Sequence, residues 1–348
     1  MNKDKTAFLS TIGLVLSYKC MLSCPSCLVN AGPDRIEEIN TDDAIKIISK
    51  LAAYRDNFIK ELKLIGGEPF FDMEKLSRIT NFASKMGLIV SSITNCYWAN
   101  TGHNAYIILS LMRGIKKLIF STDVFRQKFF PINYIENAVQ AAKSLEIPHI
   151  IEITTDDTED NEFKNLYNRT KEILSEEKIR IAVISSTPEK SKITQRCYKL
   201  YSIPYNGACD INNYPVIFPD GNILSCLGPV SMLNSSNPLI LGNILQTPID
   251  TVLDNAEKNL ALHAIRIWGP TMLLSLLRKN GYETMIPSEK IDETVCDLCY
   301  SIMSQNKIIE SFEKISKDRD FIEQIAFGRN FFLQEDIMVK KFMAEGIL

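Results

Sequence analysis

The chain has 348 residues, 45% of them hydrophobic, enough for about two domains that each bury a core. This composition excludes a disordered chain and a small stapled scaffold. The formal net charge of -3, from 39 Lys+Arg and 42 Asp+Glu, argues against a sequence-independent grip on a phosphate backbone. The longest apolar stretches, about ten residues, are far below the ~20 that span a bilayer. We therefore expect a soluble protein that binds neither nucleic acid nor membrane.

The N-terminal segment resembles a short signal peptide only superficially. Lys3 and Lys5 precede an apolar run at 7–16, but the residues before Cys20 fit neither a small-residue cleavage site nor a lipid-attachment box. We interpret the run as a buried strand. Without an export signal, the nine cysteines are better explained as metal ligands or redox groups than as a disulfide framework. A reducing cytoplasm is the expected location.

Six short apolar runs are predicted to form parallel strands. They are nearly continuous in hydrophobicity, as strands buried on both faces should be, and they span residues 8–17, 61–66, 88–95, 116–121, 149–154 and 180–185. Helical spacing between them predicts helices over 41–57, 73–86, 103–112, 132–145 and 162–174. Alternating β and α units form an α/β fold, either a barrel or an open sheet, with the ligand site beyond the carboxyl ends of the strands.

The pattern changes near residue 190, where turn-forming residues become frequent. The stretch 214–226 predicts a hairpin, residues 251–277 have helical spacing, and 302–343 is amphipathic and helical. The sequence therefore predicts three parts: a first domain over 1–190, a second domain over 191–301 and a helical tail over 302–348.

The loop after the first predicted strand carries three closely spaced cysteines. Cys20, Cys24 and Cys27 form CMLSCPSC, a C-x3-C-x2-C spacing. Three thiolates on one tight loop can hold three irons of a [4Fe-4S] cube and leave the fourth iron open to a small molecule. A zinc site completed from elsewhere in the chain, or chance spacing, is the alternative at this point.

The second predicted strand ends in Gly66, Gly67, Glu68 and Pro69. Two glycines allow close backbone approach to a ligand, and the proline stops the strand. A C-x3-C-x2-C loop after strand one, paired with GGEP after strand two, resembles the radical S-adenosylmethionine (radical SAM) superfamily over 1–190. This resemblance implies a partial (β/α)6 TIM-like barrel, a [4Fe-4S] cluster on the three cysteines, and SAM bound through its amino group to the glycines and glutamate.

The same resemblance extends to the next two strand ends. Thr94 and Asn95 stand where the family often has a TNG-like turn, and Ser121 and Asp123 end strand four, where polar groups facing SAM or substrate are common. We predict SAM contacts for the first three and a catalytic position for Asp123. The chain departs from the pattern at Cys96, which replaces the glycine and is interpreted as a small buried residue. It also departs at Ser26, where an aromatic residue is usual.

A second group of four cysteines lies in the C-terminal half of the chain. They are Cys209 and Cys226, around a predicted hairpin, and the C-x2-C pair Cys296 and Cys299. Four thiolates complete a metal site, and on thiolate chemistry alone zinc and iron are equally good occupants. The spacing C-x11-G-x4-C followed by LGNI resembles the SPASM and Twitch domains. With only four cysteines, the resemblance implies a Twitch-type domain over 191–301 that holds one auxiliary [4Fe-4S] cluster.

The resemblance implies an enzyme that cleaves SAM reductively and abstracts hydrogen from its substrate, with a flavodoxin- or ferredoxin-type protein as external electron donor. We expect oxidative modification of a ribosomally synthesised peptide, such as a crosslink, although only 19 residues precede Cys20 and leave no room for a leader-binding module. A small-molecule dehydrogenase and a peptide epimerase remain alternatives. Cys197, near the end of the first domain, is either a structural thiol or a catalytic hydrogen-atom donor. A non-catalytic iron–sulfur or zinc protein is the alternative outside the family.

Overall fold

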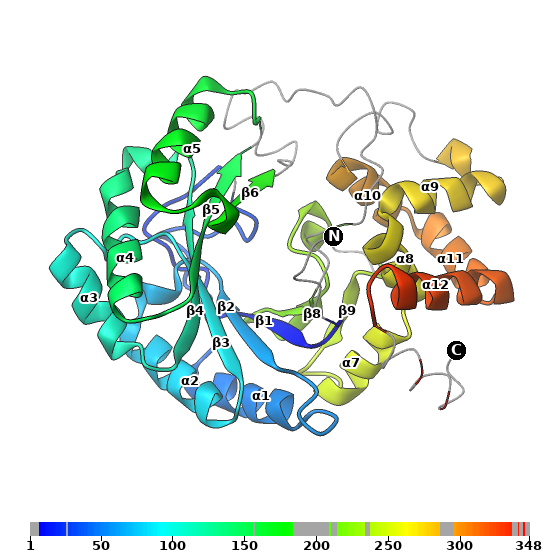
Figure 1. Cartoon of the computed structure of the whole chain (residues 1–348). Helices are drawn as coiled ribbons and strands as arrows, with labels where there is room; N and C mark the ends of the chain where they lie inside the picture. Colours follow the sequence, from blue (N-terminus) through cyan, green and yellow to red (C-terminus); the bar gives the residue numbers. More distant parts are fainter. Residues whose placement is uncertain are drawn as a thin grey trace. The chain divides into compact units, whose positions relative to one another are not determined.

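The computed structural model of the chain (Figure 1) describes residues 7–25, 27–155, 157–183, 209, 214–233, 237–285, 295–335, 340 and 344. The chain divides into two compact units. We call Ile12–Tyr198 with Phe218–Asp220 the sheet unit. The helical unit comprises Met1–Thr11, Lys199–Ile217 and Gly221–Leu348. The predicted division at residues 190 and 301 stays a prediction.

The sheet unit is built on six adjacent strands in the order β6-β5-β4-β3-β2-β1. Their bounds are β1 Thr11–Val15, β2 Glu61–Ile65, β3 Ile89–Thr94, β4 Ile115–Thr122, β5 His149–Thr155 and β6 Ile179–Val183. The pairings from β2 through β6 are all parallel. This confirms an α/β fold with a mostly parallel sheet of alternating units, consistent with a partial TIM barrel.

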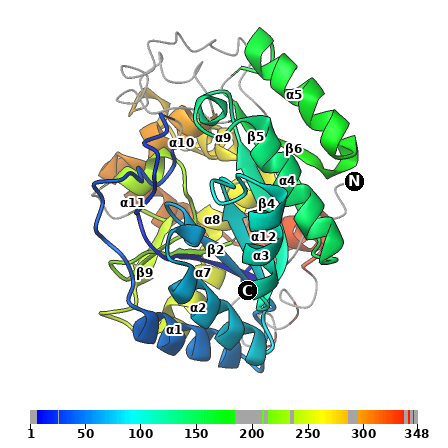
Figure 2. The ribbon, with the colours of Figure 1, turned by 90° about the vertical axis from the view of Figure 1, so that its left-hand side faces the viewer.

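Five helices connect these strands and cover one side of the sheet (Figures 1 and 2). They are α1 Thr41–Ala53, α2 Met73–Lys85, α3 Gly102–Leu111, α4 Ile132–Ser144 and α5 Asn161–Ile173. Side-chain caps fix where several of them begin: the side chains of Asn40 and Asp72 accept hydrogen bonds from backbone N–H groups in the first turns of α1 and α2. The segments between the carboxyl ends of the strands and these helix starts are where a fold of this kind places its site.

The first strand is shorter than predicted. Residues 8–10 form a turn, and β1 begins only at Thr11. Leu9 has a φ of +66°, which interrupts an extended strand, and the N–H of Phe8 donates to Glu335 Oε1 at 2.8 Å instead of to a neighbouring strand. The predicted start at residue 8 is therefore wrong, because the backbone N–H of Phe8 donates to the Glu335 carboxylate and not to a strand.

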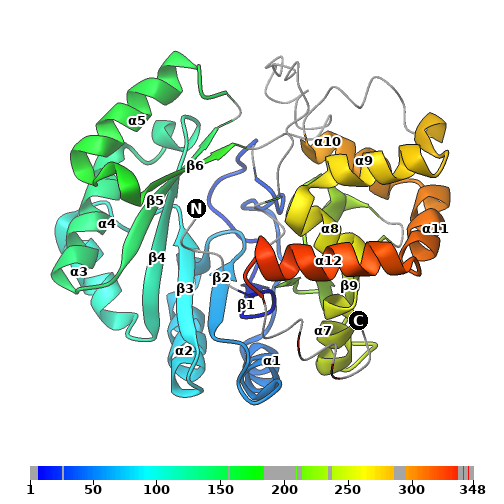
Figure 3. The same ribbon diagram turned by 45° about the vertical axis from the view of Figure 1, so that its right-hand side comes forward.

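The helical unit begins with a small antiparallel ladder, β7 Val216–Ile217, β8 Asn222–Leu224 and β9 Ile240–Asn243. The predicted hairpin is confirmed, with Gly221 at φ +83° in its turn. Six helices follow (Figure 3): α7 Ile249–Glu257, α8 Leu260–Trp268, α9 Pro270–Lys279, α10 Val295–Met303, α11 Asn306–Ile315 and α12 Arg319–Phe331. Among the described residues, no single helix meets the length and apolarity required of a membrane span. The pair α8 and α9, bent by 117°, meets that test only jointly.

Candidate functional site

The loop after β1 places its three cysteines on a small apolar base. Cys20 is buried together with Leu22 and Ala31, and the half-buried Cys24 and Cys27 pack against this group. The N–H of Cys27 donates to Cys24 O at 3.0 Å, and the N–H of Ala31 donates to Cys27 Sγ at 3.2 Å. Burial raises the pKa of Cys20 to about 12 and also raises that of Cys24. The thiols of Cys20 and Cys24 therefore keep their protons, which a metal would displace.

The two glycines after β2 are required by close approach of this same loop. A Cβ atom on Gly67 would lie 1.9 Å from Lys19 O, and one on Gly66, at φ +143°, would lie 2.5 Å from Ser17 O. The N–H groups of Gly67 and Glu68 donate to Ser17 O and Lys19 O at 2.7 and 2.9 Å. The GGEP turn is thus bonded directly to the residues that precede Cys20.

Glu68 lies at the centre of the strand-end contacts and is only 2% exposed. Its Oε1 accepts from the N–H of Phe70 at 3.0 Å and from the hydroxyl of Thr94 at 2.8 Å, and its Oε2 accepts from the N–H of Asn95 at 2.7 Å. Burial raises the pKa of Glu68 to about 7, although these donors oppose the shift. Each carboxylate oxygen has two lone pairs, so Oε2 has capacity for one further donor.

The turn after β3 continues the chain of contacts toward Cys20. The side-chain amide of Asn95 donates to Met21 Sδ at 3.3 Å and to Cys20 Sγ at 3.8 Å. Cys96 is fully buried and has a φ of +63°, a conformation in which glycine is favoured. Its thiol contacts the backbone oxygen of Thr94 at 3.9 Å.

Arg126, which the sequence motifs did not indicate, connects the end of β4 to the cysteine loop. Its Nη1 donates to Ser121 Oγ at 2.6 Å, its Nε lies 3.4 Å from Asp123 Oδ2, and its charge acts on the nearby Cys24 thiol. Although burial opposes the shift, Asp123 and then Cys24 raise the pKa of Arg126. A fixed cation therefore lies beside the predicted ligand Cys24. The sequence does carry a signal for it, because Arg126 comes soon after Ser121 and Asp123, the polar residues at the end of β4.

Two further charged residues lie on the strands beside Ser121. Strand register pairs Ser121 with Glu152 and Glu152 with Arg180, so the three are level across β4, β5 and β6. Arg180 and Glu152 form an ion pair, and both lie within electrostatic range of Lys63 on β2. Burial lowers the pKa of Lys63. Charges inside otherwise apolar parallel strands are uncommon, and this was the signal that could have found them.

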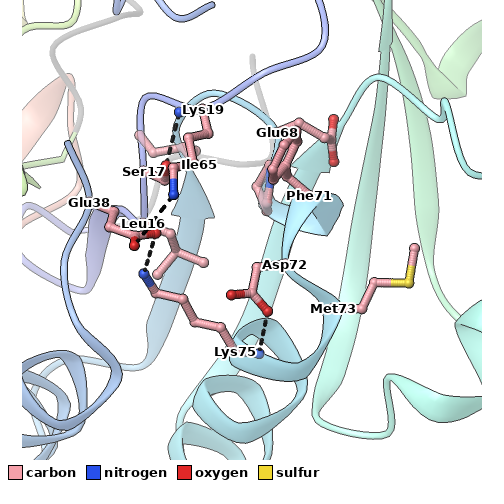
Figure 4. Close-up of a pocket in the computed structure, with 11 residues that line it drawn as sticks. Leu16, Ser17, Lys19, Glu38, Ile65, Glu68, Phe71, Asp72, Met73 and Lys75 are labelled. Atoms are coloured by element: carbon pink, nitrogen blue, oxygen red, sulfur yellow. Dashed lines mark hydrogen bonds and ion pairs between the residues drawn. The ribbon is translucent and has the colours of Figure 1, made fainter. Parts of the chain in front are cut away.

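A pocket of about 410 Å³ adjoins the GGEP turn within the sheet unit (Figure 4). Glu68 and Asp72 contribute carboxylates to its lining, and Ser17 a hydroxyl. Glu38 forms ion pairs with both lysines that line it, Lys75 at 3.2 Å and Lys19 at 3.5 Å. The pocket therefore combines apolar side chains with charges of both signs.

The second cysteine group gathers in the helical unit. A Cβ atom on Gly228 would lie 3.3 Å from Cys226 Sγ and 3.9 Å from Cys296 Sγ, so these two sulfurs flank the glycine. Burial, followed by Cys209, raises the pKa of Cys226 to about 12. Burial also raises the pKa of Cys299 well above its usual value, with further contributions from all three other thiols. The four side chains are therefore electrostatic neighbours.

The role of these residues as ligands stays a prediction. The eight described cysteines form no disulfide with one another. Among the described residues, no three His, Cys, Asp or Glu side chains are arranged to hold a metal ion. Cys197 and Ser26 lie outside the described residues.

Comparison with known proteins gives distant structural likenesses alone. No protein-family model matches the chain, and no curated protein matches it. The crystal structure of BtrN in complex with AdoMet and 2-DOIA is similar over 76% of this chain and 88% of that one, with 16% identity and a TM-score of 0.39. A carboxyl transferase domain of Rhizobium etli pyruvate carboxylase, with pyruvate, is similar over 99% of this chain, with 12% identity and a TM-score of 0.36. The chain spans 62% of that domain's length. Neither likeness supports a conclusion about function.

Proposed function

We propose that the protein is a radical SAM enzyme with a [4Fe-4S] cluster on Cys20, Cys24 and Cys27. The observation that carries the proposal is the bonding of the C-x3-C-x2-C loop to the GGEP turn. The N–H groups of Gly67 and Glu68 donate to the backbone that leads into Cys20, and Asn95 reaches the Cys20 sulfur itself. Two motifs that are distant in the sequence, ending at Cys27 and starting at Gly66, thus form one strand-end structure, as a cluster with SAM bound beside it would require.

The donor set fits such a cluster. Three thiols lie on one loop around a shared apolar base, with the cation of Arg126 close to one of them. When bound, the cluster and SAM supply a one-electron reduction that releases methionine and a 5'-deoxyadenosyl radical able to take hydrogen from an unactivated carbon. Oε2 of Glu68 has a lone pair for an ammonium donor, and Arg126 offers positive charge to a carboxylate.

We further propose that Cys209, Cys226, Cys296 and Cys299 hold an auxiliary [4Fe-4S] cluster, as in Twitch-type domains. Support comes from the mutual electrostatic proximity of the four thiols and from the small Gly228 between two of the sulfurs. A glycine at that position leaves space where any Cβ would press on Cys226. Zinc is the competing occupant, because four thiolates satisfy its coordination equally well.

The proposed substrate is a ribosomally synthesised peptide that undergoes oxidative modification, with electrons from a flavodoxin- or ferredoxin-type donor. A small molecule that is dehydrogenated, or a peptide that is epimerised with Cys197 as hydrogen-atom donor, is the second candidate. The ion pair of Glu152 with the exposed Arg180, beside Ser121, favours the small-molecule candidate, because charged groups that a ligand can reach bind a polar or ionic substrate.

The test is anaerobic reconstitution of the full chain with iron and sulfide, followed by dithionite and SAM. We expect about eight irons per chain, from one cube held by three thiolates and one held by four, and formation of 5'-deoxyadenosine. Cys24→Ala should abolish 5'-deoxyadenosine formation, because no cluster with an open iron can assemble. Cys226→Ala should retain part of it.

Two outcomes would contradict the proposal. A reconstituted chain that binds iron but forms no 5'-deoxyadenosine is a non-catalytic iron–sulfur protein. A variant with Cys20, Cys24 and Cys27 all replaced should still hold about four irons; if it holds zinc and no iron, the auxiliary-cluster proposal is wrong while the radical SAM proposal stands.

A further inference from the structure

The surface of the helical unit carries an exposed group of three phenylalanines. Phe327, Phe331 and Phe332 are 60%, 67% and 48% exposed, and we call them the α12 aromatic patch. The rings of Phe327 and Phe331 stack with centroids 5.4 Å apart, and Phe332 meets Phe331 edge-on at 5.3 Å. Isolated exposed apolar side chains are ordinary on protein surfaces, but a contiguous aromatic group indicates an interaction surface.

The patch is not the buried face of its helix. The inward face of α12 consists of Phe321, Ile325, Gly328 and Arg329, all buried. A Cβ atom on Gly328 would lie 2.8 Å from Ile267 on α8, which shows how tightly α12 packs onto that helix (Figure 3). Helix packing thus accounts for one face of α12 and leaves Phe327 and Phe331 on the other.

A pocket opens beside the patch and shares its aromatic side chains. Its volume is about 590 Å³, and Trp268, Phe327 and Phe332 supply its apolar lining. Asp320, Glu323 and Gln324 supply its polar lining. Phe331, the most exposed of the three rings, is not part of the lining and stands next to the pocket.

We propose that this surface is a homodimer interface, in which Phe331 of each copy enters the pocket of the other. A two-fold interface requires one surface to carry both a projecting group and the hollow that receives it, because each residue pair then occurs twice. The α12 aromatic patch and its pocket meet that requirement on one helix face. The occupant is therefore a second copy of this chain.

The exposed rings would supply a large share of the apolar area that such an interface needs. At about 200 Å² per phenylalanine, the three exposed fractions correspond to roughly 350 Å² per copy. Two copies would bury about 700 Å² through these rings alone, close to half of the ~1,600 Å² of a standard interface. The polar face of α12 around the rings would supply the rim.

Electrostatics do not oppose the pairing. Glu323 is paired on its own helix with Arg319, at 2.9 Å, so much of the acidic charge at the pocket is already compensated. An antiparallel arrangement of the two α12 helices separates the acidic first turns of the copies and aligns their dipoles favourably. Central aromatic contacts with charge at the edge are the usual composition of an interface.

The test is sedimentation velocity on the full reconstituted chain from about 1 to 100 µM, a range that covers dissociation constants of weak to moderate dimers. We expect a species of twice the 39.5 kDa chain mass. Phe331→Asp should weaken self-association by at least about 30-fold, the loss typical of a central aromatic anchor. Phe331→Leu should keep the dimer. Leu245→Asp, at another exposed apolar position in the same unit (78% exposed), is the matched control and should also keep it.

Tryptophan fluorescence gives a second readout. Trp98 is 4% exposed, whereas the half-buried Trp268 lines the pocket, so dissociation should shift the emission to the red through Trp268. A folded Phe331→Asp protein, checked by circular dichroism, should show the shifted emission at every concentration. A wild-type chain that is monomeric throughout the range overturns the proposal. A dimer that persists unchanged in Phe331→Asp also overturns it.

Discussion

The hydroxyl of Thr94, at the end of β3, donates a hydrogen bond to Glu68 Oε1 at 2.8 Å and accepts one from Trp98 Nε1 at 2.9 Å. Both contacts are buried, and Trp98 stacks on Phe70, which follows Glu68, with ring centroids 4.8 Å apart. The Thr94 hydroxyl therefore holds the Glu68 carboxylate and also the Trp98 ring that packs against Phe70. The glutamate of this turn is held in place before any ligand arrives.

We expect Thr94→Val to destabilise the protein by about 2–3 kcal/mol, because it leaves Trp98 Nε1 unpaired and removes one donor from a buried carboxylate. The matched control is Thr170→Val. Thr170 is also fully buried, but its hydroxyl only contacts Leu166 O within α5, so its loss should cost about 1 kcal/mol or less. Urea unfolding of both variants measures the difference. Equal losses would mean that Thr94 does not organise Glu68.

The glycine pair gives a prediction about the cysteine loop. Gly67→Ala should destabilise the protein by at least about 3 kcal/mol, because its Cβ would press on backbone and not on a movable side chain. Gly87→Ala is the control: its φ is +86°, but nothing lies within 4 Å of the added atom, so it should cost about 1 kcal/mol from conformation alone.

Iron content separates the two glycine variants further. Lys19, which Gly67 contacts, immediately precedes Cys20, so displacement of the loop should lower iron incorporation in Gly67→Ala and leave it unchanged in Gly87→Ala. Normal iron content in a folded Gly67→Ala protein would contradict a tight coupling between the turn and the loop.

The sequence predicted the regular parts of the sheet unit well, because a parallel strand buried on both faces must be apolar along its whole length. The six runs appear as β1 to β6, and the strand ends bring Glu68, Thr94, Asn95 and Cys20 into contact. Arg126, Glu152 and Arg180 were missed because charged residues have no periodicity. Their importance comes from strand register and from partners elsewhere in the chain.

The helical unit shows the same limit more strongly. Arg329 donates to Glu257 and to Glu335 at 2.8 Å each, and Arg266 donates to Glu335 at 2.6 Å, with every one of these side chains at most 2% exposed. In the sequence these are ordinary charges of amphipathic helices, best interpreted as solvated. Only the packing of α7, α8 and α12 places them inside the unit.

We expect Arg329→Leu to lower the free energy of unfolding by about 3–5 kcal/mol, because it leaves two buried carboxylates with fewer partners. Arg319→Ala, on the same helix, removes the ion pair with Glu323 that lies in solvent, and should change stability by less than about 0.5 kcal/mol. Chemical denaturation of the two variants tests this. A small effect of Arg329→Leu would show that water or a rearranged side chain replaces the guanidinium.

His263 provides the pH prediction. Arg266 Nη1 lies 2.9 Å from its Nδ1, and since arginine can only donate, the proton of the neutral ring is on Nε2, which donates to Glu257 O at 2.9 Å. Burial, with Arg329 and Arg266, lowers the pKa of His263 well below 6.5. The unfolded chain therefore binds one more proton below about pH 6.5, and folding stability falls as the pH decreases.

His263→Gln keeps a donor and an acceptor but cannot titrate. The wild type should lose stability relative to this variant as pH falls from 6.5 toward 5, by up to about 1.4 kcal/mol per unit. Taking the difference removes the opposite contribution of Glu257, whose pKa burial raises to about 7. It also removes the contribution of Glu335: burial would raise the pKa of that carboxyl, but Arg266 and Arg329 lower it to about 2. Parallel stability curves would show that His263 is already protonated in the folded protein.

Cys96 stands where the TNG-like turn has glycine, so substitutions at this position can test whether its backbone favours glycine. The residue has a φ of +63° and is fully buried, so the backbone favours glycine while the cavity favours the thiol. Cys96→Gly relieves about 1 kcal/mol of backbone strain and loses a similar amount of packing. Cys96→Ala keeps the strain and loses the sulfur contacts. At an ordinary buried position alanine is better than glycine by roughly 0.5–1 kcal/mol. Here we expect the glycine variant to be at least as stable as the alanine variant in urea unfolding, with unchanged iron content in both. A loss of iron in both variants would instead assign the Cys96 thiol to the cluster.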